Sequence, residues 1–175
     1  MSKIVKGILR VAVGIVQLAV SLVVIMSLIS AVNVVMNQDL AAIIGGVDIN
    51  IDPMDPSTNN FTLPLVLDNS EGLHDIDDLT INMQLRAYNI TNTSESYPIF
   101  NETESFNLAA GDILNELLYY GNTSFTWDPD LIAGFIANSS AYMGEFFLDI
   151  SANYKIMMDK ITIPFGFNAT MEMVF

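Results

Sequence analysis

The sequence predicts a mainly β protein in which an N-terminal transmembrane helix precedes an antiparallel β-sandwich. Two features of the chain lead to this prediction. Residues 11–36 form a run of 26 residues without a charge, and about 20 apolar residues are enough to cross a bilayer as a helix. After residue 46, apolar and polar residues alternate in several runs, as they do in strands that bury one face and expose the other.

The uncharged run is expected to be a signal anchor. At 1.5 Å per residue it would measure about 39 Å, against about 30 Å for the hydrocarbon core of a bilayer. Three of the six basic residues lie within residues 1–10, and all 20 acidic residues follow the run, so the positive-inside rule places the N-terminus in the cytoplasm. We therefore expect a cytoplasmic tip (1–10), a single-pass transmembrane helix (11–36), a stalk (37–46) and an extracellular domain (47–175) at the cell membrane.

Two other interpretations of the N-terminus stay open. A signal peptide cleaved near Ala31 would also join basic residues to an apolar stretch, although such stretches run about 7–15 residues. Lys6-Gly7-Ile8-Leu9, just ahead of the apolar run, resembles the processing site of archaeal type IV prepilins. That resemblance implies a pilin-like or filament subunit, assembled through its N-terminal hydrophobic helix.

One side of the predicted helix carries small and polar residues. Gly14, Gln17 and Ser21 fall within a sector of about 60°, as in helices that pack against one another in membranes. Polar residues at 27, 30 and 33 point in other directions. A homo-oligomer or a membrane-protein partner contacting the first three residues is one hypothesis, and simple tolerance of weakly polar residues in a single span is the other.

Five runs of the extracellular part alternate clearly: residues 47–52, 63–67, 79–87, 146–156 and 161–175. The last two are separated by residues 157–160 and should form a hairpin. Residues 106–108 and 113–120 are further candidates for strands, and Asp128-Pro129-Asp130 is typical of the start of a short helix. Several strands with short connections predict one sandwich or barrel, and a domain of about 130 residues can bury a core without disulfides.

Several of these segments resemble the late-embryogenesis-abundant, water-stress type of β-sandwich domain. The similar segments are the strand with Leu63, Leu65 and Leu67, the turn Asp68-Asn69-Ser70, the strand 78–88, residues 106–111 and the closing strands around 148–163 with Pro164. The resemblance covers roughly residues 47–175. It implies an immunoglobulin-like fold behind a membrane helix, and a binding or structural module without established catalytic residues.

Charge and composition exclude several classes of function. The chain has a net charge of −14, and residues 37–175 hold 20 acidic residues against three basic ones, a net charge of −17. Such a domain repels phosphate backbones, so we expect no nucleic-acid partner. The chain has no cysteine, which excludes disulfides and thiolate chemistry.

N-glycosylation is the modification that the sequence predicts. Asn-x-Ser/Thr sequons occur at Asn60, Asn89, Asn92, Asn101, Asn122, Asn138 and Asn168, all after the apolar run. Chance would give about two sequons in this composition, so we expect N-linked glycans on an extracellular domain. A cysteine-free, acidic glycoprotein fits an archaeal cell surface better than an animal secretory pathway, with a bacterial source as the alternative.

The segment after residue 67 gathers oxygen-bearing side chains. Asp68, Asp75, Asp77 and Asp78 are weak candidates for a Ca²⁺ site. Their spacing does not match an EF-hand loop, so a solvated turn is the competing interpretation and we expect no cofactor. His74, the one histidine, lies in the same turn, but no convergent set of nucleophile, base and orienting acid can be recognised. We therefore expect no enzyme, and a surface hydrolase is kept as an alternative.

Aromatic residues gather between the clearer strands. They are Tyr119, Tyr120, Trp127, Tyr142, Phe146 and Phe147. Large apolar side chains are usually core, so a partner-binding patch is the alternative interpretation. Taken together, these features predict a membrane-anchored, N-glycosylated cell-surface protein with a structural or protein-interaction role in the envelope.

Overall fold

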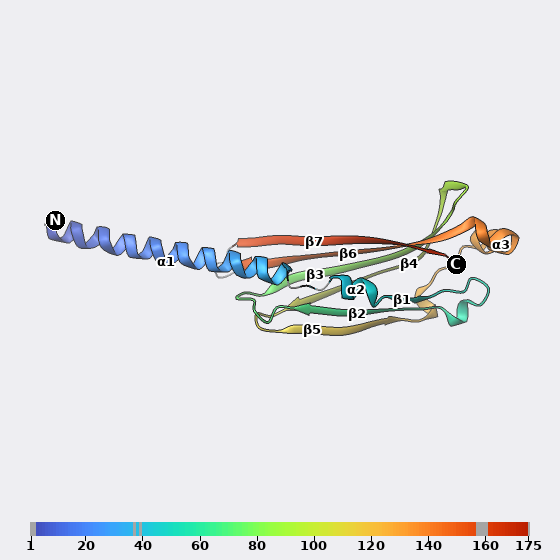
Figure 1. Ribbon diagram of the computed structural model, residues 1–175, viewed down its shortest axis with the longest axis horizontal. Helices are drawn as coiled ribbons and strands as arrows, with labels where there is room; N and C mark the ends of the chain where they lie inside the picture. The colour runs from blue at the N-terminus through green and yellow to red at the C-terminus, as the bar shows by residue number, and fades with distance from the viewer. Residues whose placement is uncertain (1–2, 37, 39, 157–160, 175) are drawn as a thin grey trace.

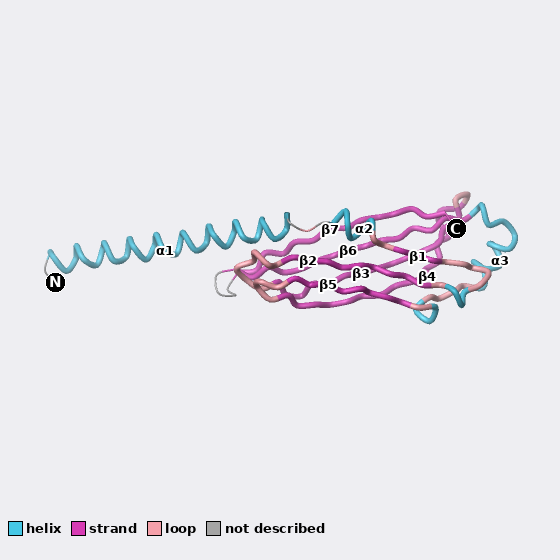
Figure 2. The backbone as a smooth tube through the Cα atoms, turned by 60° about the horizontal axis from the view of Figure 1, so that its bottom comes forward, coloured by secondary structure: helices cyan, strands magenta, loops and turns pink. Residues whose placement is uncertain are grey.

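A long helix and an elongated β-sandwich make up the molecule. The computed structural model describes residues 3–36, 38, 40–156 and 161–174. Helix α1 (Lys3–Met36) leaves one end of the sandwich and roughly continues its long axis, as both Figure 1 and Figure 2 show. Its stretch Ala12–Val34, 23 residues with a mean hydropathy of 2.5, is long and apolar enough to cross a membrane.

Two antiparallel sheets form the sandwich, as predicted. The smaller sheet has the strand order β1-β2-β5 and consists of β1 (Asp48–Asn50), β2 (Asn60–Asp68) and β5 (Ile113–Tyr120). The larger sheet has the order β4-β3-β6-β7 and consists of β3 (Ile76–Asn89), β4 (Asn92–Leu108), β6 (Tyr142–Ile156) and β7 (Ile161–Val174). Each of the five alternating runs contains a strand; the turn 157–160 and residue 175 lie outside the described residues.

Short helical segments connect the strands at the end of the sandwich away from α1 (Figure 1). They are η1 (Pro56–Thr58), η2 (Asn122–Ser124), α3 (Pro129–Asn138) and η3 (Ser139–Ala141). The predicted short helix is α3, and the Asp128 carboxylate accepts a 2.8 Å hydrogen bond from the Asp130 amide at its first turn. This bond satisfies a helix N–H that would otherwise lack a partner.

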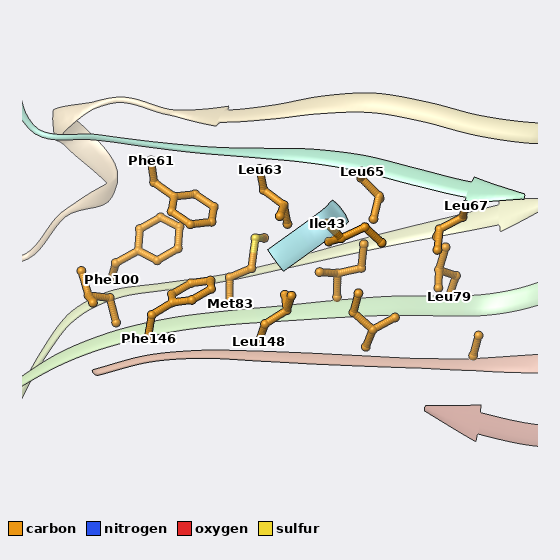
Figure 3. Packing of buried hydrophobic residues seen from close by; sticks show 14 of the residues in the cluster. Ile43, Phe61, Leu63, Leu65, Leu67, Leu79, Met83, Phe100, Phe146 and Leu148 are labelled. Atoms are coloured by element: carbon orange, nitrogen blue, oxygen red, sulfur yellow. The ribbon is translucent and has the colours of Figure 1, made fainter. Parts of the chain in front are cut away.

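The core lies between the sheets, where the apolar phase of each alternating run meets the other sheet. Figure 3 shows Phe61, Phe100 and Phe146 from β2, β4 and β6 facing one another, and the Phe61 centroid lies 5.0 Å from Phe100 and 5.3 Å from Phe146. Leu63 and Leu65 of β2 are fully buried beside them. The two-residue period therefore corresponds to burial on one face of each strand.

The segment predicted as a stalk contains a second helix, α2 (Leu40–Gly45). Ile43 of α2 is buried in the core, and Gly46 lies so close to Pro64 of β2 that a Cβ atom there would collide with the proline ring. Residues 37 and 39 of the predicted stalk lie outside the described residues. Because α2 buries apolar surface against β2, this segment is packed onto the sandwich instead of standing free.

Candidate functional site

The C-terminal turns of α1 are packed onto the end of the sandwich. Ser27 (1% exposed), Ser30 (5%), Ala31 and Val34 are buried and share one helix face, since residues three, four and seven positions apart lie above one another. Ile29 and the other apolar residues of the opposite face stay exposed. The helix that could cross a membrane is therefore also a part of the sandwich.

Tyr154 of β6 and Ser30 of α1 form the centre of this junction. Their hydroxyl oxygens are 2.8 Å apart, and the Tyr154 oxygen also accepts from the amides of Leu73 at 3.1 Å and His74 at 3.3 Å. With its acceptor positions taken, the Tyr154 O–H donates to Ser30, whose own hydroxyl donates to the Glu71 carbonyl at 3.4 Å. Three backbone groups and two hydroxyls thus find partners in a site where Tyr154 has no exposed surface.

His74 extends the same junction. Its Nε2 lies 3.0 Å from the Ser27 hydroxyl, and its ring meets the Tyr154 ring edge to face. Among the described residues, no carboxylate is hydrogen-bonded to the imidazole, and Ser27 is almost fully covered by its neighbours. A serine nucleophile needs both an oriented base and access to substrate, so this pair has the geometry of a packing contact.

Gln38 connects α1 to the end of β2. Its amide nitrogen donates to the carbonyls of Val34 at 2.6 Å and Asp68 at 2.8 Å, and its amide oxygen accepts from the Asp68 amide at 3.0 Å. The side chain therefore pairs with the Asp68 backbone as a strand residue would. This contact fixes the chain direction as it leaves the helix.

Asn69 organises the loop between β2 and β3. It is fully buried, and its side-chain nitrogen donates to the carbonyls of His74 at 3.1 Å and Ala109 at 2.9 Å. A Cβ atom at Gly72 would collide with the Asn69 side chain, so the loop needs a glycine there. The loop that presents Leu73 and His74 to α1 is thus held by one amide.

The four aspartates that were weak candidates for Ca²⁺ have separate partners. Asp68 accepts from the Ser70 amide, Asp75 from the Ala110 amide and Asp78 from Asn153, while Asp77 forms an ion pair with Lys155. Hydrogen bonds from Ser70 lower the pKa of Asp68. Within the described part of the chain, no three His, Asp or Glu side chains converge to hold a metal ion.

The helix residues singled out in the sequence differ from those that make contacts here. Gly14, Gln17 and Ser21 are exposed in this structure, and no heavy atom lies near the Cβ position of Gly14. Among the helix residues whose burial is described, Ser27 and Ser30 are the buried polar ones, and both point away from the stripe of Gly14, Gln17 and Ser21. The spacing 27, 30, 31 and 34 was a signal that could have identified them, but nothing in the sequence indicated their partners.

None of the sequon asparagines is buried. Asn60, Asn89, Asn92, Asn122 and Asn138 lie at the end of the sandwich away from α1, and Asn101 and Asn168 lie on the two edge strands of the larger sheet. In three sequons the hydroxyl of the third residue donates to the asparagine oxygen, as for Thr91 and Asn89 at 2.7 Å. The end of the sandwich next to α1 carries no sequon.

The aromatic group is divided between core and surface. Phe146 and Tyr142 are buried, Trp127 and Tyr120 are partly buried, and Phe147 is half-buried on the outer face of the larger sheet. Tyr119 is 65% exposed on the outer face of the smaller sheet, where Val66, Leu117 and Ile113 are exposed as well. This apolar face, defined by Val66, Ile113, Leu117 and Tyr119, is called the β2–β5 face below.

An apolar cavity of about 160 Å³ lies between the sheets close to the junction. Gln38, Leu79, Ile150 and Phe165 are among its lining residues. An engineered cavity of about 150 Å³ with such a lining binds benzene. The cavity therefore has room for one apolar group of that size.

No protein-family model, curated protein or solved structure matches the chain.

Proposed function

We propose that the protein is a single-pass, N-glycosylated cell-surface protein whose sandwich serves a structural or protein-interaction role in the envelope. The observation that carries this proposal is the continuity of α1, which is apolar and exposed along its projecting part and locked into the sandwich at Ser30 and Tyr154. Such a junction holds the domain at a fixed height and orientation on its anchor. The basic N-terminal residues support a cytoplasmic N-terminus.

The β2–β5 face supports a role in protein interaction. It places four apolar side chains in solvent on a domain whose other sheet has the sequons Asn101 and Asn168 on its edge strands. Exposed apolar patches of this kind often mark interaction sites, and exposed aromatic residues such as Tyr119 are the usual anchors. Glycans at Asn101 and Asn168 would leave this face accessible, and a glycan at Asn60, the first residue of β2, would lie at the end of the face away from α1.

A non-enzymatic role is part of the proposal. The Ser27 hydroxyl is covered by the junction, and the described partners of the His74 ring include no acid. A surface hydrolase would need an accessible nucleophile with an oriented base. We also propose no bound cation, because the four candidate carboxylates are each engaged elsewhere.

A filament subunit is the second candidate function. The junction between α1 and the sandwich favours this candidate as well. If the α1 helices of neighbouring subunits packed together, the rigid junction would also fix how their sandwiches are arranged around the filament. N-terminal sequencing of native protein distinguishes the two candidates. A chain starting at residue 7 or 8 would support processing as a pilin, and an intact N-terminus would support the anchor.

Glycopeptide mass spectrometry on membrane fractions tests the main proposal. We expect glycans on several of the seven asparagines, and protease treatment of intact cells should digest the sandwich while an N-terminal tag stays protected. Cells disrupted before protease treatment serve as the control, since the tag should then be digested. Seven unmodified asparagines, or a tag digested in intact cells, would contradict the proposed topology.

A further inference from the structure

The junction fixes how far the sandwich stands from the membrane. The Leu73 amide donates to the Ser30 hydroxyl at 3.0 Å, so the loop between β2 and β3 lies at the level of Ser30 along α1. The helix is continuous through this level. The depth of Ser30 in a bilayer therefore determines the depth of this end of the sandwich.

Helix geometry then gives that depth. Ser30 follows Arg10 by 20 residues, which at 1.5 Å per residue is about 30 Å, the thickness of the hydrocarbon core. If Lys6 marks the cytoplasmic boundary instead, Ser30 lies about 6 Å farther out, still within the headgroup layer. A tilted helix would bring Ser30 deeper, because its length projected on the membrane normal is shorter.

The surface chemistry of this end fits such a position. Leu73 is 53% exposed beside α1, and Ile161 and Ile113 are exposed at the same end. Exposed carboxylates, Glu71 and Asp112 among them, would be costly in hydrocarbon and so limit how deep the end can sink. No sequon lies here, so no N-linked glycan would hold the end away from lipid.

We propose that the α1-proximal end of the sandwich, around Leu73, rests in the headgroup layer of the bilayer. This inference depends on the proposed anchoring through α1. The sandwich is then seated on the membrane, with the loop between β2 and β3 as the contact. The far end, with five of the sequons, points away from the lipid.

Because the chain lacks cysteine, single-cysteine variants test the proposal directly. L73C and, as the matched control, M54C at the far end are labelled with nitrobenzoxadiazole in the full-length chain. Both positions are exposed and apolar. Each protein is reconstituted into phosphatidylcholine vesicles containing lipid with a nitroxide at carbon 5 or carbon 12 of an acyl chain.

We expect the shallow nitroxide to quench most of the emission at position 73 and little at position 54. The deep nitroxide should quench position 73 less than the shallow one does. Equal, weak quenching at both positions would overturn the proposal, as would stronger quenching at position 73 by the deep nitroxide. Alkaline carbonate extraction separates the two levels of failure: release of the protein refutes the anchor itself, whereas retention with an unquenched position 73 refutes only the seating on lipid.

Discussion

Replacing Tyr154 by phenylalanine tests the junction between helix and sandwich most directly. The substitution removes one oxygen and leaves the ring, so packing in the core should be kept. The His74 amide then loses its described acceptor, while the Leu73 amide keeps the Ser30 hydroxyl at 3.0 Å. The Ser30 hydroxyl also loses its 2.8 Å donor.

The expected cost follows from these groups. One buried amide without a partner costs about 1–3 kcal/mol, and a lost hydrogen bond about 1 kcal/mol. Since the His74 bond is long at 3.3 Å, we expect a total near the lower end, about 2 kcal/mol. For a domain of this size that corresponds to a decrease of about 8 °C in Tm.

Thermal unfolding of the full-length chain in detergent, followed by circular dichroism, measures this loss. Tyr119→Phe is the matched control, because it makes the same chemical change at a tyrosine that is 65% exposed. A double-mutant cycle with Ser30→Ala adds a second criterion: two residues of one network should show a coupling of about 1 kcal/mol. If Tyr154→Phe unfolds at the temperature of the control, or if the two losses simply add, the argued network is wrong.

Three further substitutions test other parts of the fold by the same unfolding assay. Leu63→Ala empties a fully buried site and should cost about 2–5 kcal/mol; a loss under 1 kcal/mol would contradict the described core. Arg86→Ala removes an ion pair to Glu145 at 2.6 Å and a contact 4.5 Å above the Phe147 ring. We expect the free energy of unfolding to fall by less than about 1 kcal/mol, and by less still in high salt, because the ion pair is in contact with solvent. Burial and a carboxylate partner raise the pKa of Tyr120, so the free energy of unfolding of the wild type should fall as the pH rises above about 10. The free energy of unfolding of Tyr120→Phe should fall less over the same pH range. An equal dependence on pH in the two proteins would refute this.

The alternation of apolar and polar residues predicted a strand in each of the five clear runs, because burial on one face has a two-residue period. Most of β4 (Asn92–Leu108) was not predicted, since only residues 106–108 of it were candidates. Pairing between strands could not be predicted in this way. The strand containing Leu63 and Leu65 pairs with β5, about 50 residues away, instead of with the next strand along the chain. Sheet order depends on contacts between distant segments, which a local pattern does not contain.

The candidate site shows the same limit more sharply. Tyr154 falls in the apolar phase of its run, so the sequence indicated that its ring points inward. Its hydroxyl contacts Ser30, which is 124 positions away, and only the folded chain brings the two together. Gly14, Gln17 and Ser21 do lie on one side of the helix, as their spacing indicated. The sandwich covers other side chains, which lie near the C-terminal end of α1.

The sequence by itself determined the apolar helix, the strands and the distribution of charge, because each of these depends on residue type and local period. The tertiary structure decided where the apolar helix stops projecting and becomes part of the domain. That boundary is set by buried hydroxyl and amide groups, which must find partners once water is excluded. Ser30 found its partners on one loop and one strand that lie far from it in the sequence.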